Sequence, residues 1–208
     1  MKSRFRSTTT LQERLAYAPA VLLVHGSGGP LRGIDPFARQ ASGMGVHVFV
    51  VHYFERTGHS WVSPVIIQEF FMQWLETLRD GFSYILAQPG VDPQRVGLLG
   101  FSLGGFLSLA FATQEQRIAA VAQLFGGLPE YFMEDAGKLP PVLILHGGRD
   151  TVVPVAEAEK LEAILQQHHI PYEIKIYSDQ GHHFTGLAQI DALRRVVAFF
   201  RRYLQKAA

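Results

Sequence analysis

Short, continuous runs of apolar residues alternate along this chain with segments of helical periodicity. The runs are rich in valine, isoleucine and leucine, and they cover residues 20–24, 46–53, 95–99, 118–125, 142–146 and 172–177. Apolar runs of this length without polar alternation are typical of strands buried on both faces, as in a parallel sheet. The pattern therefore predicts an open parallel sheet covered by helices.

The segments between these runs have the spacing of helices. In the longest, apolar residues recur every three or four positions from Ile67 to Ile85, which predicts an amphipathic helix. Residues 103–113 are apolar nearly all round and predict a deeply buried helix, and residues 156–168 and 187–204 complete the alternation. In the last helix, the residues expected to face the core are Leu187, Ile190, Leu193, Val197 and Phe200.

Alternating strands and helices predict a doubly wound, mostly parallel α/β fold with helices on both faces. We expect a single domain over residues 1–208, in which residues 1–18 form an N-terminal extension or an edge segment. The least regular stretch, residues 125–141, is too short for a folded cap domain.

Composition narrows the function. The chain has 208 residues, of which 48% are hydrophobic and 18% charged, with a formal net charge of +1 and no basic stripe. This balance argues against disorder and against nucleic-acid or membrane-surface binding. The absence of cysteine excludes disulfides and thiolate chemistry. No apolar segment is long enough to target or span a membrane, so we expect a soluble, cytoplasmic protein.

A candidate nucleophile is Ser102, in the sequence GFSLG at residues 100–104. The pattern G-x-S-x-G is a weak signal by itself, but here it directly follows an apolar run and directly precedes the buried helix beginning at Leu103. A strand–turn–helix setting is what a nucleophile elbow requires. The positive end of the helix would favour a developing oxyanion.

A serine nucleophile needs a base and an acid that orients the base. Asp150 follows one predicted strand, and His182 and His183 follow the next. The order Ser, Asp, His is that of the α/β-hydrolases, and all three residues would lie at the carboxyl ends of parallel strands. Asp179 is an alternative acid and His183 an alternative base. The adjacent histidine pairs have no accompanying carboxylate cluster and predict no metal site.

The sequence HGSGG at residues 25–29 follows the first clear strand. In a hydrolase such a loop supplies one backbone donor of the oxyanion hole, here near Ser27 or Gly28, and the N–H of Leu103 supplies the other. Glycines allow the backbone to approach a ligand closely.

Together these motifs resemble the dienelactone hydrolase family of α/β-hydrolases, from about residue 19 to residue 204. The matching pieces are HGSGG, HYFERTG at 52–58, VDPQRVGLLGFSLGG at 91–105, LHGGRDTVVP at 145–154 and GHHF at 181–184. The family pattern Gly-x-x-His-x-Phe selects His182 as the base, and its strand-end aspartate maps to Asp150. The namesake enzymes carry a cysteine nucleophile and a loop glutamate where this chain has Ser102 and Ser27.

The resemblance therefore implies a cofactor-free serine hydrolase that cleaves small carboxylic esters through an acyl-enzyme. A thioesterase, lactonase or peptidase would use the same residues, and a ligand receptor without turnover is a further alternative. The expected partner is a small-molecule ester, with no nucleic acid and no membrane, and the protein is expected to be a monomer or homodimer.

The expected substrate-binding residues are Tyr53, Arg56, Phe101 and Trp61, and the further candidates for the pocket walls are Phe54, Tyr131 and Phe132, with burial in the core as the alternative for each aromatic. Arg56 would bind a substrate carboxylate, unless it is a solvated loop residue paired with Glu55. Without a cap the pocket should be shallow and open, which predicts a preference for short acyl chains.

Overall fold

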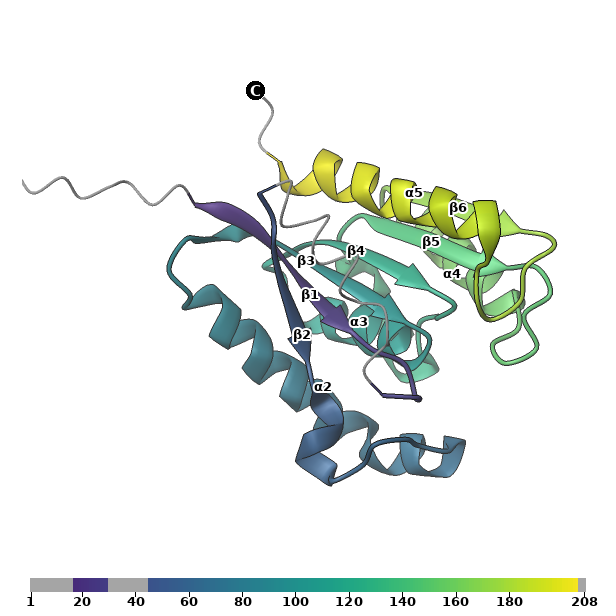
Figure 1. Ribbon diagram of the computed structural model, residues 1–208, viewed down its shortest axis with the longest axis horizontal. Helices are drawn as coiled ribbons and strands as arrows, with labels where there is room; N and C mark the ends of the chain where they lie inside the picture. The colour runs from purple at the N-terminus through teal and green to yellow at the C-terminus, as the bar shows by residue number, and fades with distance from the viewer. Residues whose placement is uncertain (1–16, 30–44, 206–208) are drawn as a thin grey trace, which may run out of the picture.

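The computed structural model describes residues 17–29 and 45–205, whose strands form one six-stranded parallel sheet (Figure 1). The strands are β1 (Ala18–Val24), β2 (His47–Val51), β3 (Val91–Phe101), β4 (Ile118–Leu124), β5 (Val142–Gly147) and β6 (Tyr172–Tyr177). Their order is β2-β1-β3-β4-β5-β6, and every neighbouring pair is parallel. The predicted parallel sheet is confirmed, and all its carboxyl ends lie at one edge.

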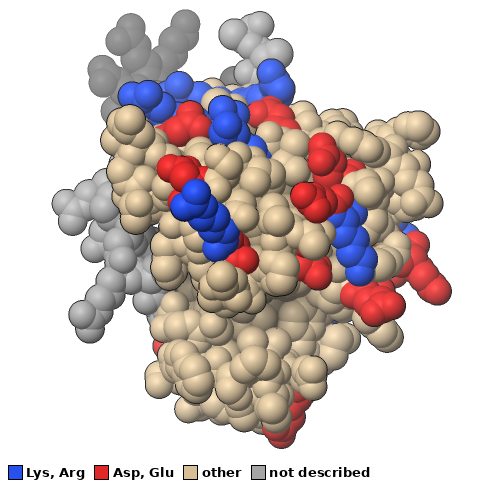
Figure 2. All heavy atoms as spheres, turned by 90° about the vertical axis from the view of Figure 1, so that its right-hand side faces the viewer, with Lys and Arg blue, Asp and Glu red and all other residues tan. Residues whose placement is uncertain are grey.

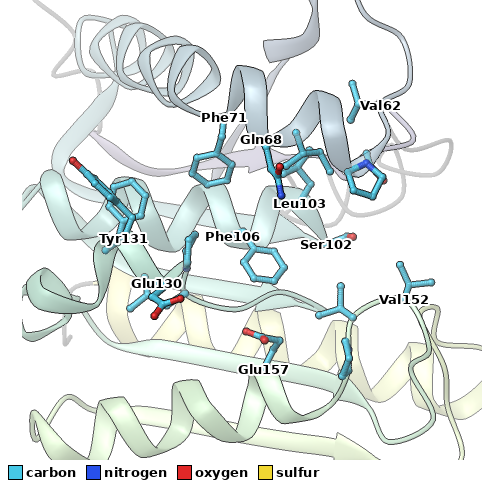
Figure 3. A pocket seen from close by; sticks show the side chains of 18 of the residues that line it. Val62, Gln68, Phe71, Ser102, Leu103, Phe106, Glu130, Tyr131, Val152 and Glu157 are labelled. Atoms are coloured by element: carbon cyan, nitrogen blue, oxygen red, sulfur yellow. The ribbon is translucent and has the colours of Figure 1, made fainter.

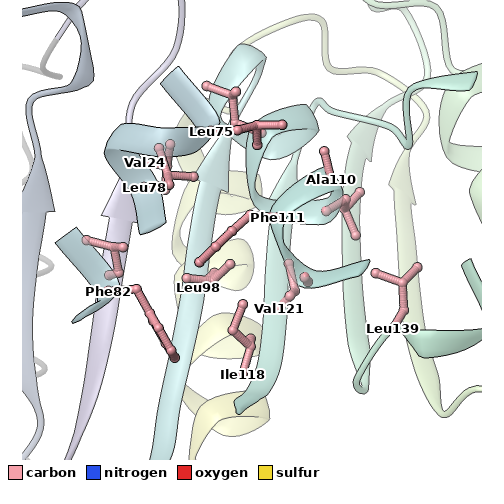
Figure 4. Packing of buried hydrophobic residues seen from close by; sticks show 14 of the residues in the cluster. Val24, Leu75, Leu78, Phe82, Leu98, Ala110, Phe111, Ile118, Val121 and Leu139 are labelled. Atoms are coloured by element: carbon pink, nitrogen blue, oxygen red, sulfur yellow. The ribbon is translucent and has the colours of Figure 1, made fainter. Parts of the chain in front are cut away.

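Helices cover both faces of the sheet, as predicted. They are α2 (Pro64–Leu86), α3 (Leu103–Gln114), α4 (Ala156–Gln167) and α5 (Gly186–Leu204). Successive residues of a strand point to opposite faces, so Leu22 of β1 belongs to the core layer that includes residues of α2, α3 and α4, while its neighbour Leu23 belongs to the layer that includes residues of α5. In the first of these layers, the rings of Phe82 and Phe111 meet edge to face with centroids 5.7 Å apart (Figure 4).

The face of α5 that meets the sheet differs in part from the prediction. Leu187 and Ile190 are 84% and 48% exposed. The buried residues of this helix are Ala192, Val196, Phe199, Phe200 and Leu204. Apolar residues stand next to one another at 196–197 and 199–200, so the sequence pattern does not fix the rotation of the helix.

Two short 3-10 segments lie in the loops at the carboxyl edge. They are η1 (Tyr53–Thr57), after β2, and η2 (Glu130–Lys138), within the stretch 125–141 that was expected to be irregular. Of the expected N-terminal segment 1–18, residues 1–16 lie outside the described residues. None of the described helices is long and apolar enough to cross a membrane.

The contact between α3 and β1 depends on Gly104. A Cβ at this position would lie 2.1 Å from Val24 O and 2.5 Å from His25 O, so an alanine would push the helix away from the sheet. We expect Gly104→Ala to lower the free energy of unfolding, measured by urea denaturation, by about 1–3 kcal/mol. The control is Gly28→Ala, because a Cβ there meets nothing within 4 Å. Equal stability of the two variants would contradict this account of the packing.

Candidate active site

Ser102 occupies a strained turn between β3 and α3. Its φ of 52° and ψ of −119° lie in a region that residues other than glycine rarely adopt. The turn is tight because Gly100 and Gly104 are in direct contact: a Cβ on Gly100 would lie 2.3 Å from Gly104 O. The N–H of Ser102 donates to Leu124 O at 2.8 Å, which fixes the turn to the neighbouring strand β4.

The structure brings Ser102, His182 and Asp150 together from the ends of β3, β6 and β5. His182 Nε2 lies 2.9 Å from Ser102 Oγ, and His182 Nδ1 lies 2.8 Å from Asp150 Oδ2. Because a carboxylate accepts hydrogen bonds, Nδ1 carries the proton and donates a hydrogen bond to Asp150. Nε2 is then unprotonated and accepts from the Ser102 hydroxyl. This geometry leaves the imidazole ready to take a proton from the serine.

Asp150 is held as a buried carboxylate. Its Oδ1 accepts hydrogen bonds from the N–H groups of Val152 and Val153, both at 2.9 Å. Burial acts to raise the pKa of Asp150, but the hydrogen bonds from Val153, His182 and Val152 outweigh burial and hold this pKa below its ordinary value. The group therefore remains ionised and accepts the hydrogen bond from His182 Nδ1 as a carboxylate.

A second histidine, His146 at the end of β5, contacts the same loop. It is fully buried, and its Nε2 donates to Val153 O at 2.9 Å and lies 3.4 Å from Asp150 Oδ2. His146 therefore braces the loop whose N–H groups hold the carboxylate.

The alternatives weighed from the sequence lie apart from this arrangement. Asp179 and His183 are both exposed, and His182 hydrogen-bonds to Asp150 rather than to Asp179. The ring of His183 lies 5.6 Å from that of His182, centroid to centroid, and also contacts Phe125.

Two backbone segments face the pocket next to Ser102. Leu103 begins α3, where N–H groups have no partner within the helix, and it lines the pocket together with Ser27. A Cβ on Gly26 would lie 3.3 Å from Ser102 Cβ, so glycine is what allows the loop to approach the serine. Gly28 is exposed and is not a lining residue. Of the expected oxyanion-hole residues, Leu103 and Ser27 are thus placed beside Ser102.

The pocket at Ser102 is larger than the sequence led us to expect. Its volume is about 1030 Å³, at the upper end for small-molecule sites, and it opens as a hollow at the carboxyl edge of the sheet (Figure 2). Helix α2 forms one wall, the start of α4 the opposite wall, and η2 closes the far end (Figure 3). The pocket is thus larger than the shallow cleft expected from the sequence.

Three of the four expected substrate-binding residues lie elsewhere. Tyr53 is fully buried, and its hydroxyl donates to His25 O at 2.7 Å. Arg56 pairs with Asp80 at 3.3 Å rather than with Glu55. Phe101 packs against the core beneath α5. Trp61, in contrast, lines the pocket and is 65% exposed.

Of the further candidate wall residues, Tyr131 and Phe132 line the pocket, whereas Phe54 is buried. Most of the other lining residues were not expected. Ile67 and Phe71 fit the apolar stripe of α2, and both line the pocket. Phe106 is half-buried, whereas the neighbouring residues of α3 are buried. One available signal was its spacing, since a residue four positions after the serine lies on the same side of the helix.

The described residues contain no group of three histidine, aspartate or glutamate side chains placed to hold a metal ion. The parallel sheet, the helices on both faces and the serine on the turn after β3 define an α/β-hydrolase fold. A model of the dienelactone hydrolase family matches residues 8–204. The chain belongs to this family, and membership indicates a hydrolase.

Comparisons with individual proteins agree with this family membership. A carboxymethylenebutenolidase of Rhodococcus opacus is 30% identical over 199 residues, which cover 83% of this chain and 78% of the relative. Carboxymethylenebutenolidase relatives from Yersinia pestis, Salmonella typhimurium and Synechocystis, each named as putative, match over 43%, 48% and 60% of their own length.

Two solved structures share the fold. A dienelactone hydrolase-like promiscuous phosphotriesterase, P91, from metagenomic libraries has a TM-score of 0.79 and 18% identity, covering 90% of this chain and 87% of its own. Esterase PE8 has a TM-score of 0.74 and 22% identity, covering 91% and 94%.

Proposed function

We propose that this protein hydrolyses small-molecule carboxylic esters, with Ser102 as nucleophile, His182 as general base and Asp150 as the orienting acid. The observation that carries the proposal is the continuous hydrogen-bonded chain from Ser102 Oγ through the imidazole to the carboxylate, with distances of 2.9 and 2.8 Å. Such a chain, with the serine on a strained turn at a pocket, is the arrangement that activates a hydroxyl for acyl transfer.

In the first half of the reaction, Ser102 Oγ attacks the ester carbonyl carbon while His182 Nε2 takes the hydroxyl proton. Asp150 stabilises the resulting imidazolium. The oxyanion of the tetrahedral intermediate accepts hydrogen bonds from the backbone N–H groups of Leu103 and Ser27. The intermediate then collapses, and the alcohol departs with the proton from His182. The acyl group remains bound to Ser102 Oγ.

In the second half, His182 takes a proton from water, and the resulting hydroxide attacks the acyl carbon. Collapse of this second intermediate releases the carboxylic acid and returns the proton to Ser102. The proposed mechanism uses no metal and no organic cofactor.

A general ester is favoured over the substrate for which the relatives are named by the serine nucleophile, in place of the cysteine of the namesake enzymes, and by the surface position of Arg56. The relatives are named for carboxymethylenebutenolide, a substrate with a carboxylate, whereas Arg56, the arginine expected to bind one, pairs with Asp80 on the surface. These departures support a general esterase rather than the activity for which the relatives are named.

The test is a comparison of kcat/KM on matched ester, thioester, lactone and peptide substrates, together with labelling by a fluorophosphonate. We expect the ester to be hydrolysed with the highest kcat/KM, and the label to be found on Ser102 in a peptide digest. A higher kcat/KM on any of the other three acyl donors would contradict the assignment to esters. Absence of both turnover and labelling would instead favour a binding protein.

A further inference from the structure

The groove extends away from Ser102 along α3. Phe106 lies four residues after the serine, about 6 Å further along the helix axis, and its half-buried ring forms part of the groove wall. Beyond it, the ring of Phe71 lies 6.2 Å from that of Phe132, which lies 5.2 Å from Tyr131. An apolar surface therefore continues well past the space that a short acyl chain would fill (Figure 3).

Large apolar side chains at the rim of this groove are exposed. Trp61, Met72, Tyr131 and Val152 are 65%, 52%, 81% and 66% exposed, and all four line the groove. They come from four parts of the chain, namely the loop before α2, α2 itself, η2 and the loop after β5, yet all line one pocket, so they are gathered at one site rather than scattered over the surface. Exposed apolar surface around a pocket is typical of a ligand-binding site.

The charged side chains of the groove disfavour an acidic substrate. Glu157 points into it from the side opposite α2 (Figure 3), and Glu130 and Lys160, both exposed, are the other two charged lining residues. Glu157 lies close to the apolar wall, because a Cβ on Gly127 would lie 2.9 Å from Glu157 Oε2 and 3.0 Å from Phe106 Cε1. A substrate carboxylate would lose hydration among apolar side chains and meet a net negative charge.

We propose that the groove between α2, α3 and η2 binds the extended apolar portion of an uncharged ester, such as an acyl chain of medium to long length. This inference rests on the proposed function, because it places the ester carbonyl at Ser102. It reverses the expectation from the sequence, which favoured short chains and, through Arg56, acidic ones.

The first test is the dependence of kcat/KM on acyl length, with nitrophenyl esters assayed below the concentration at which they aggregate. Each methylene that enters an apolar site raises kcat/KM by up to about fourfold. We expect kcat/KM for the dodecanoate to exceed that for the butyrate by about tenfold or more, which is the gain expected when a few methylenes are well buried. A flat profile, or one that falls beyond the butyrate, would overturn the proposal.

A matched pair of tyrosine variants tests where the acyl chain binds. Tyr131 and Tyr84 are both largely exposed, at 81% and 62%, but only Tyr131 lines the groove. We expect Tyr131→Ala to reduce the ratio of kcat/KM for the dodecanoate to that for the butyrate severalfold, and Tyr84→Ala to leave this ratio unchanged. Equal ratios in the two variants would place the acyl chain elsewhere.

A second pair of variants tests the preference for neutral over acidic esters. We expect wild type to hydrolyse an ester whose acyl chain ends in a carboxylate at least tenfold more slowly than the corresponding neutral ester, and Glu157→Gln to narrow this difference. Glu159, on the same helix, is exposed and outside the groove, so Glu159→Gln should not narrow it. A preference for the acidic ester would refute the inference.

A binding measurement separates this inference from the proposed catalysis. Methyl ketones are uncharged and cannot be hydrolysed, so calorimetry with ketones of increasing length measures occupation of the groove without turnover. Tighter binding of the longer ketone by an inactive protein would support the groove and reject the esterase. Equal binding of short and long ketones would reject the groove, whatever the activity on short esters.

Discussion

Ser102→Ala is expected to abolish ester hydrolysis while leaving the fold intact. Removal of a nucleophilic serine from such a hydrogen-bonded arrangement lowers kcat by a factor on the order of 10⁶. The stability should change little, because the Ser102 side chain faces the pocket and opens no cavity in the core when truncated. Activity is measured on a neutral ester, and the folded state by thermal unfolding and circular dichroism.

An exposed serine at the same edge of the sheet provides the control. Ser178 follows β6 and is exposed, so Ser178→Ala should keep its activity and its labelling by a fluorophosphonate, whereas Ser102→Ala should lose both. If the folded Ser102→Ala variant retained more than a few per cent of the wild-type rate, the nucleophile would have to be another group.

The sheet and the three residues at its carboxyl edge were predictable because both depend on local pattern and chain order. A strand buried on both faces has to be apolar throughout, which is visible in the sequence of β5, VLILHG. Parallel strands then place whatever follows them at one edge, so Ser102, Asp150 and His182 could be brought together without knowing any distance.

The groove was not predictable because its walls come from elements that are distant in the chain. Phe71 and Phe106 have the spacing and the apolar character of core residues, and they line the pocket because it lies between α2 and the start of α4. The prediction for Tyr53 was wrong in the opposite sense, because a residue expected in the pocket lies in the core. It follows a strand end, but the 3-10 segment η1 turns its ring into the core, where it stacks on His25 with ring centroids 4.2 Å apart.

The partner of Arg56 shows a similar limit. Glu55 is adjacent in sequence, but successive side chains leave a helical turn in different directions. The guanidinium instead reaches Asp80 and Thr77 on α2. Both contacts are made on the surface, where an ion pair contributes little to stability.

Substitution of His182 is expected to have an effect as large as that of Ser102, and substitution of the adjacent His183 a small one. His182 makes both hydrogen bonds of the chain from Ser102 to Asp150, whereas His183 is exposed and contacts the rings of Phe125 and His182. His182→Ala should lower kcat by a factor on the order of 10⁶. His183→Ala should keep most of the activity, because it loses only loop packing.

The comparison of the two variants is informative because they differ by one position in the same loop. A structural disturbance of the loop would lower turnover in both variants. A loss of turnover confined to His182→Ala therefore identifies His182 as the base and is not explained by damage to the loop. Fluorophosphonate labelling gives a second readout, since without the base the Ser102 hydroxyl is no longer activated and its labelling should slow sharply in His182→Ala alone. A greater loss of turnover in His183→Ala would mean that the imidazole facing Ser102 in solution is that of His183, with the hydrogen bonds to Ser102 and Asp150 reassigned accordingly.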